Sequence, residues 1–268
     1  MKRKNLENSI WGFILGDVWG VPYEFQDKSY CQRYFKKFNG DIGVWNKPSG
    51  TWSDDTSLTL SLMDSYENGF FNIEKHKQNL IAFYQNGKYT VDGLFDIGGA
   101  TRDSIISNFH KDTRTYMGNG GLLRIWLAVV LKPEQIIELL KLTHSTRPVM
   151  IDAINIYKEM YDEIYLSSTI STKTVDKWND YLYHQHILEE SMGTIVNSLA
   201  ITIKSLLNNE SLEDVIKKGG DTDSNGAIFG SLYYINREVP VRYRKKIRNY
   251  EYLNLMINSF LDRYYGGN

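Results

Sequence analysis

The sequence predicts an all-α fold. Apolar residues recur at three- and four-residue spacing in nearly every long segment, which is typical of helices that bury one face. Only five prolines occur in the 268 residues, and none of them lies in a proline-rich linker. We therefore expect about ten or more helices packed as one compact domain over residues 1–268.

Four segments show this spacing most clearly. Residues 57–68 and 148–166 each place apolar side chains along one face, and residues 195–206 and 253–261 repeat the pattern. The stretch 167–185 is rich in Ser, Thr, Lys, Asp and Asn, and we expect it to be a solvated excursion from the core. The four apolar stripes are Leu58, Leu62, Tyr66; Ile151, Ile154, Tyr157, Tyr161, Ile164; Ile195, Leu199, Ile203, Leu206; and Leu253, Ile257, Phe260, Leu261.

The composition excludes several classes of protein. Lys and Arg number 31 against 32 Asp and Glu, and 42% of residues are hydrophobic, so neither a disordered chain nor a strongly basic nucleic-acid binder fits. The longest aliphatic run, residues 127–131, is far shorter than the roughly 18–20 residues that cross a bilayer. The single cysteine, Cys31, cannot form an internal disulfide and fits a reducing compartment. We expect a cytoplasmic protein that does not span a membrane.

A first acidic motif, Ser53-Asp54-Asp55-Thr56, directly precedes the helix predicted for residues 57–68. Such residues cap helices, because their side-chain oxygens accept bonds from the first backbone N–H groups and favour the helix dipole. The same oxygens are also the ligands preferred by Mg²⁺, Mn²⁺ and Ca²⁺. The motif by itself is compatible with either role.

A second acidic motif spans residues 219–226 and reads Gly-Gly-Asp-Thr-Asp-Ser-Asn-Gly at the start of another predicted helix. Asp221 and Asp223 fit a cation site, and a turn without catalytic function is the alternative. An EF-hand is excluded, because Leu232 stands where its twelfth-position Glu would be. Gly226 and Gly230, four residues apart, favour close helix packing over contact with a ligand.

A third motif, Gly-Asp-Val-Trp-Gly-Val-Pro-Tyr-Glu over residues 16–24, is a glycine-rich helix end that runs into a loop. Its last residue, Glu24, is flanked by Tyr23 and Phe25. An apolar setting raises the pKa of a carboxyl group, as a general acid or base requires. An ordinary position in a surface loop is the alternative.

Weaker signals are residues 95–101, which contain Asp96, then residues 118–121 followed by Arg124, and the pair Thr143-His144. Taken alone, a histidine such as His144 is more often a hydrogen-bonded residue near a helix end than a catalyst. The sequence has no H-E-x-x-H, G-x-S-x-G, G-x-x-x-x-G-K-[ST] or G-x-G-x-x-G motif, which argues against the common zinc, serine, P-loop and Rossmann enzymes.

Taken together and in this order, the motifs resemble those of the ADP-ribosylglycohydrolase family, from about residue 10 to about residue 244. The two acidic motifs are the specific part of the resemblance. One departure concerns residues 193–197, Gly-Thr-Ile-Val-Asn, which place Asn197 where the family usually has an acidic residue. The stretch 167–185 has no counterpart that we can place.

The resemblance implies an all-α fold with a two-metal centre, Mg²⁺ or Mn²⁺, at the bottom of an ADP-ribose cleft. The metal ligands that it implies are Ser53, Asp54, Asp55, Asp221, Asp223 and Ser224. Electrostatics favours the same two-metal centre. Four carboxylates drawn together from distant parts of the chain repel each other by several kcal/mol unless cations neutralise them.

The implied activity is hydrolysis of the bond between ADP-ribose and an acceptor, which reverses mono-ADP-ribosylation. Glu24 and Asp96 are the candidates for proton transfer, and the sequence does not separate them. The glycines of residues 118–121 suit close approach of backbone N–H groups to the pyrophosphate. The full set of expected substrate-binding residues is Asp17, Gly98, Gly118, Asn119, Gly120, Gly121 and His144.

Several alternatives stay open at this point. The expected partner is an ADP-ribosylated protein or a small ADP-ribose conjugate. Arginine is the favoured acceptor, with serine, a nucleic-acid base and a small ester as the others. A catalytically silent protein that binds ADP-ribose or metal is a rival interpretation, as is another Mg²⁺-dependent hydrolase such as a phosphoesterase. The sequence does not predict the oligomeric state.

Overall fold

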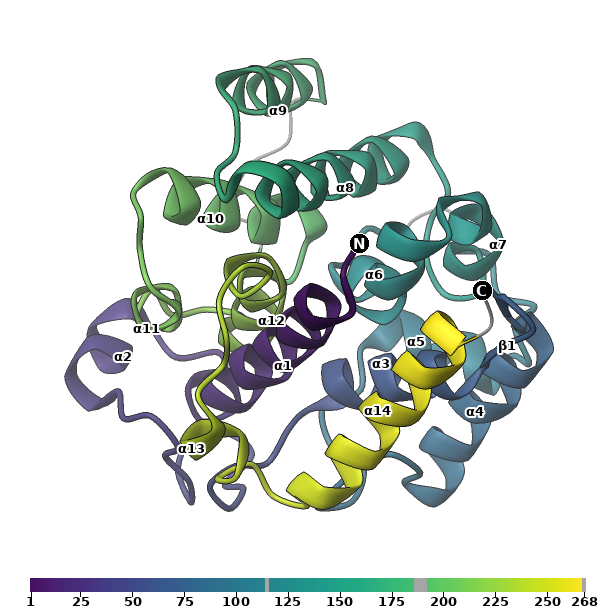
Figure 1. Cartoon of the computed structure of the whole chain (residues 1–268). Coiled ribbons are helices and arrows are strands. Elements are labelled where there is room, and N and C mark those ends of the chain that lie inside the picture. Colours follow the sequence, from purple (N-terminus) through teal and green to yellow (C-terminus); the bar gives the residue numbers. More distant parts are fainter. Residues whose placement is uncertain (114–115, 186–191, 267–268) are drawn as a thin grey trace.

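Two glycine-rich helices, α1 (Arg3–Gly20) and α12 (Thr222–Tyr233), pack directly against each other at the centre of the molecule (Figure 1). The computed structural model describes residues 1–113, 116–185 and 192–266. A Cβ atom on Gly16 would lie 2.0 Å from the carbonyl oxygen of Gly226, and one on Gly12 would lie 2.3 Å from that of Gly230. This contact confirms that Gly226 and Gly230 serve helix packing.

The other elements surround this central pair. Over the described residues the chain forms fourteen α-helices, two short 3-10 helices, η1 (Val21–Tyr23) and η2 (Pro133–Gln135), and one hairpin, which confirms the all-α prediction. None of these helices is both long and apolar enough to cross a membrane. The remaining helices are α2 (Lys28–Tyr34), α3 (Asp54–Asp64), α4 (Ile73–Asn86), α5 (Gly99–Ile106), α6 (Gly120–Leu131), α7 (Ile136–Leu140), α8 (Pro148–Ser167), α9 (Thr172–Gln185), α10 (Ile195–Leu207), α11 (Leu212–Ile216), α13 (Val241–Arg244) and α14 (Tyr250–Gly266).

The predicted helices agree with the structure except at the end of α3. The helix expected over residues 57–68 ends at Asp64, and a hairpin of β1 (Tyr66–Glu67) and β2 (Phe70–Phe71) follows it. The turn residues Asn68 and Gly69 have φ values of +51° and +86°, a left-handed conformation that a helix does not admit. Tyr66 still lies in the core, at 3% exposure, so the apolar stripe was placed correctly and only the backbone differs.

The polar stretch 167–185 forms a helix of its own rather than an irregular loop. Helix α9 lies outermost in Figure 1, beyond α8, so the predicted excursion from the central body is observed. Trp178, at 2% exposure, anchors α9, and the Thr174 hydroxyl donates a 2.8 Å hydrogen bond to Glu163 Oε1 on α8. Trp178 and the polar contacts to α8 therefore help to hold this segment in place, and Val175 also packs against the core.

Candidate metal centre and active site

A cavity of about 240 Å³ lies where the starts of α3, α5, α6 and α12 come together. Most of the residues expected to form a site lie in its wall. They are Glu24, Asp54, Asp55, Asp96, Gly98, Gly118, Asn119, Gly120, His144, Asp221 and Ser224. Residues from six separate parts of the sequence thus meet around one space.

Asp17 fixes the start of α3 from behind the cavity wall. Its Oδ1 accepts a 2.9 Å bond from the Ser53 backbone N–H, and its Oδ2 accepts bonds from the backbone N–H and the hydroxyl of Thr56, at 3.0 and 2.5 Å. Asp17 is completely buried. This placement corrects the expectation that Asp17 contacts substrate: both of its oxygens are occupied by α3, so it positions the first acidic motif.

In the first acidic motif, one residue caps the helix and two others are free for the expected cation binding. Ser53 is the cap of α3, because its hydroxyl oxygen accepts a 3.2 Å bond from the Asp55 backbone N–H. The carboxylates of Asp54 and Asp55 are not needed for capping and line the cavity instead. Asp54 Oδ2 accepts a 3.2 Å bond from the Gly98 N–H, which ties the motif to the start of α5.

The second acidic motif is held by the loop that carries Glu24. The Phe25 N–H donates to the Gly220 carbonyl and the Gly220 N–H donates to the Gln26 carbonyl, both at 2.8 Å. Gly219 permits this approach, because it has a φ of +79° and a Cβ there would lie 2.6 Å from the Gln26 carbonyl oxygen. Asp221 precedes α12 without capping it, and its Oδ2 instead accepts a 2.7 Å bond from Asn119 Nδ2.

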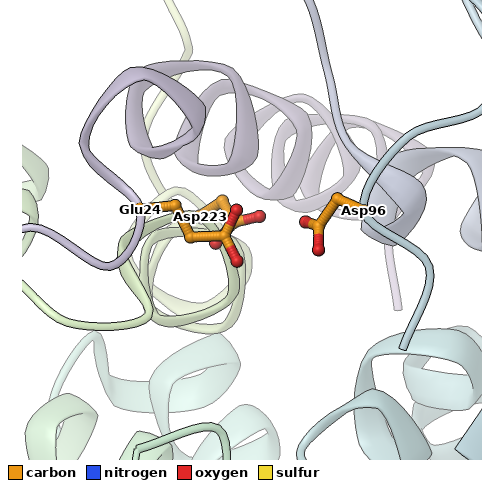
Figure 2. A group of neighbouring side chains, drawn as sticks. All are labelled: Glu24, Asp96 and Asp223. Atoms are coloured by element: carbon orange, nitrogen blue, oxygen red, sulfur yellow. The ribbon is translucent and has the colours of Figure 1, made fainter. Parts of the chain in front are cut away.

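Three carboxylates approach one another most closely in this region (Figure 2). Glu24 follows η1, Asp96 lies in the loop before α5, and Asp223 lies in the first turn of α12. One oxygen from each lies within 4.8 Å of the other two, a spacing at which one cation would touch all three. Figure 2 shows Asp96 facing the other two side chains. The sequence assigned these residues to different roles, and the structure puts them in one group.

Burial and mutual repulsion raise the pKa values of these carboxyl groups. Burial, followed by the charge of Asp96, raises the pKa of Glu24 to about 10, and burial raises that of Asp96 to about 6. Burial also raises the pKa values of Asp54, Asp55 and Asp223 well above the usual range, with the neighbouring charges adding to the shift. The charged groups that contribute to these pKa shifts are all Asp or Glu. The cluster is therefore a region of negative potential that bound cations would stabilise.

The donor set fits a hard divalent cation. Carboxylate and hydroxyl oxygens are the atoms that Mg²⁺ and Mn²⁺ prefer, and they are the groups gathered here. Asp223 Oδ1 is buried and has no hydrogen-bond partner among the described residues. A buried charged oxygen without a partner is costly, and a bound cation would satisfy it.

Another part of the cavity wall, next to Asp221, contains the residues expected to contact the rest of a ligand. Gly118, Asn119 and Gly120 line it beside His144. Gly121 does not share this position, because a Cβ there would lie 3.0 Å from His144 Cγ and 3.1 Å from Met150 Cε, inside the packing behind the wall. The expectation for Gly121 is corrected accordingly: it lets the His144 ring lie close to α6.

Some contributors were not found from the sequence. Trp45 Nε1 donates a hydrogen bond to Glu24 Oε2, and no motif pointed to this residue of an irregular segment. Thr101 also lines the cavity; it lies in residues 95–101, where the pattern points to Asp96 and Gly98 and gives no signal for a threonine. Asn197 lies at a neighbouring cleft of about 400 Å³ that shares Asp221 with the cavity. The position where the family usually has an acidic residue thus lies on the same cleft as the second acidic motif.

The fold and the cavity define an all-helical protein whose site is made by two acidic helix starts. The chain belongs to the ADP-ribosylglycohydrolase family, whose model, described as ADP-ribosylglycohydrolase, matches residues 2–267. This match confirms the resemblance that the motifs indicated. It also identifies the chain as a member of a family of hydrolases.

Three similar proteins illustrate the relationship. A protein of Acanthamoeba polyphaga mimivirus, provisionally named an ADP-ribosyl glycohydrolase, is 26% identical over 85% of this chain and 86% of its own length. The ADP-ribosylarginine hydrolase Tri1 of Pseudomonas putida (strain GB-1) is 21% identical over 96% of this chain and 78% of that protein. A solved structure titled "ADP-ribosylglycohydrolase-related protein complex" has a TM-score of 0.72 at 18% identity, covers 98% of each chain and supports the fold.

Proposed function

We propose that this protein hydrolyses the glycosidic bond between C1 of the distal ribose of ADP-ribose and an acceptor side chain. The reaction releases free ADP-ribose and restores the acceptor. Family membership supports the reaction class. The observation in this chain that supports it best is the meeting of acidic groups at one cavity: Glu24, Asp54, Asp55, Asp96 and Asp221 line it. Asp223 lies next to them, with an oxygen within 4.8 Å of those of Glu24 and Asp96.

The proposal includes two divalent cations, Mg²⁺ or Mn²⁺. The side chains of Asp54, Asp55, Asp221, Asp223 and Ser224 would hold them, and Ser53 is less suited because its hydroxyl already caps α3. Glu24 and Asp96 lie close enough to Asp223 to reach the same cation, and we assign them to proton transfer instead. Cations in such a site polarise ribose hydroxyls and lower the pKa of bound water. Asp17 and Asn119 would keep the two motifs in place through their hydrogen bonds to α3 and Asp221.

The protein's own groups account for the other requirements of glycosidic cleavage. The reaction passes through a state with positive charge on the ribose, which an acidic cavity stabilises. Glu24 and Asp96 are the candidates for moving the proton, because both line the cavity and their carboxylates face each other (Figure 2). Gly118 and Gly120, which also line the cavity, leave the backbone there accessible to the rest of the ligand.

Arginine is the acceptor that we propose. The name of the Pseudomonas putida relative assigns it ADP-ribosylarginine as substrate. The charge of the cavity supports the same choice, because a guanidinium group is a cation and this site gathers acidic groups.

The test is product analysis with defined substrates. The protein is incubated with arginine-linked and serine-linked ADP-ribosyl peptides, with and without Mg²⁺ or Mn²⁺, and the products are identified by mass. We expect free ADP-ribose and unmodified peptide from the arginine-linked substrate when metal is present. Release of AMP or phosphate would instead indicate a phosphoesterase, and binding of ADP-ribose without turnover would indicate a silent binding protein.

A further inference from the structure

Arg124 is a buried cation whose partners are all uncharged. It lies on α6, directly behind the glycine wall of the cavity, and it is completely buried. Its Nε donates to Thr143 Oγ1 at 3.1 Å, its Nη1 to His76 Nε2 at 3.0 Å, and its Nη2 to the Leu139 carbonyl oxygen at 2.6 Å. Burying a guanidinium group without a carboxylate partner is costly, so its three hydrogen bonds need an explanation.

The network reaches the cavity through Thr143 and His144. Thr143 is completely buried, and its Oγ1 lies 2.8 Å from His144 Nδ1. The other ring nitrogen of His144, Nε2, lies at the wall: it would be 3.4 Å from a Cβ on Gly118 and 3.6 Å from one on Gly120. His144 is therefore the one member of the network that lines the cavity.

Counting protons assigns the tautomer of this ring. Arginine has donors only, so Arg124 Nε–H must occupy one lone pair of Thr143 Oγ1. The single Thr143 hydroxyl proton then has His144 Nδ1 as its hydrogen-bond acceptor among the described residues. If His144 Nδ1 carried a proton, that buried hydroxyl proton would lack a partner. Nδ1 is thus the acceptor, and the proton of the ring is on Nε2.

The same counting applies on the other side of Arg124. Arg124 Nη1–H donates to His76 Nε2, so the proton of His76 is on Nδ1, where Ser61 Oγ lies at 3.2 Å. A positive charge on either ring would face the guanidinium of Arg124. Burial, and then the charge of Arg124, lower the pKa of His144 to about 3. The ring facing the cavity therefore stays neutral across the physiological range.

We propose that Arg124 and Thr143 are positioning residues that fix His144 as a neutral imidazole, so that its Nε2–H donates one hydrogen bond to an oxygen atom of the bound ADP-ribose. This inference rests on the proposed function, because that function supplies the ligand. It gives Arg124 a role that needs no contact with substrate. A neutral donor also keeps the polar contact without adding a cation that would compete with metal or with an arginine acceptor.

The first experiment measures the tautomer directly in the ligand-free protein. The ¹⁵N chemical shifts of the His144 ring distinguish a protonated from a bare nitrogen. We expect a protonated Nε2 and a bare Nδ1, unchanged between about pH 5 and 8, where an ordinary histidine titrates. A proton on Nδ1, or a titration within this range, would overturn the assignment whether or not the protein is a hydrolase.

The second experiment asks whether this donor acts on the ligand. Thr143→Val removes the hydroxyl while keeping the shape, so a loss of about 10–100-fold in ADP-ribose affinity is expected by calorimetry, the range for a hydrogen bond to a charged group. Thr143→Ser should restore the affinity. Thr202→Val is the matched control, because Thr202 is also buried and its hydroxyl has no hydrogen-bond partner among the described residues.

A double-mutant cycle separates this role from a general loss of packing. In a His144→Phe background the donor is already absent, so Thr143→Val should cost no further affinity. Equal losses in both backgrounds, or unchanged affinity in Thr143→Val alone, would show that Thr143 does not act through His144. If the wild-type protein neither binds nor hydrolyses ADP-ribose conjugates, the proposed function fails together with the ligand contact, whereas the measured tautomer still decides the assignment.

Discussion

The hydroxyl of Ser224 donates a 3.0 Å hydrogen bond to Asp55 Oδ2, although 169 residues separate the two in sequence. This bond joins the first turn of α12 to the first turn of α3. It brings together the two acidic motifs by direct contact between their side chains. The carboxylates around it have raised pKa values, so the cluster is at its most stable when something offsets their charge.

Removal of divalent metal is expected to abolish turnover and lower the Tm. Cations that bind only the folded state stabilise it by about 2.7 kcal/mol at one hundred times their Kd. Activity assays and thermal unfolding after EDTA treatment, and again after addition of Mg²⁺ or Mn²⁺, test this directly. Full activity after verified removal of metal would refute the two-metal proposal.

Asp55→Asn and Asp223→Asn are each expected to remove most of the activity while leaving the helical circular-dichroism signal intact. Metal affinity should fall by at least about 10–100-fold, the range for residues that only orient a ligand. Without metal these variants should melt above the wild type, because one repelling charge is gone. Asp176→Asn on α9 is the control, since it makes the same charge change on an exposed residue away from the cavity. Normal turnover with reduced stability would favour a purely structural role for the motifs.

Glu24→Gln and Asp96→Asn distinguish the two candidates for proton transfer. The variant that removes the acid or base is expected to lower kcat by roughly 10²–10⁴ while ADP-ribose binding survives. Single-turnover hydrolysis at saturating substrate and calorimetry provide the two measurements. A collapse of affinity with near-normal turnover would identify the altered residue as a binding group instead.

The stability of the metal-free protein is expected to fall as the pH rises from 5 to 8. Asp17 and Asp96 have pKa values raised to about 6 and Glu24 to about 10, so the folded state binds more protons than the unfolded chain in this range. The buried His76 and His144, whose pKa values are lowered, act in the opposite sense below about pH 7, but the acidic groups with raised pKa values outnumber them. The net stability should therefore decrease with pH, because it rises only where the unfolded state binds more protons. Urea unfolding at several pH values measures the slope, which saturating Mg²⁺ should reduce. A metal-free protein that becomes more stable toward pH 8 would contradict the repulsion described here.

Asp17→Asn is expected to lower the free energy of unfolding and the metal affinity. It should have no direct effect on contacts to ADP-ribose. The amide would place a donor against backbone N–H groups that now donate to a carboxylate, at a cost of about 1–3 kcal/mol. Chemical unfolding and metal titration test the two effects. Unchanged metal affinity together with a raised KM would restore Asp17 to the substrate-binding residues.

Features that depend on local sequence could be predicted. Apolar spacing located α8 and α10 to within a residue, and the acidic residues of both motifs were placed correctly at helix starts. The role of Asp17 could not be predicted in this way, because its partners Ser53 and Thr56 lie 36 and 39 residues away. The contact of Trp45 with Glu24 and the hairpin after α3 likewise depend on packing or on turn conformation that helical spacing does not encode.

The glycine contact between α1 and α12 means that the dimensions of the acidic cavity depend on main-chain atoms. Gly16 immediately precedes Asp17, and Gly226 lies three residues after Asp223, so the distance between the two backbones also sets how far apart the acidic groups stand. A methyl group added at Gly12, which does not line the cavity, would push the helices apart and widen the site. Tolerance to mutation should therefore be lowest at the glycines in the contact between α1 and α12, although they have no side chains that could bind or react.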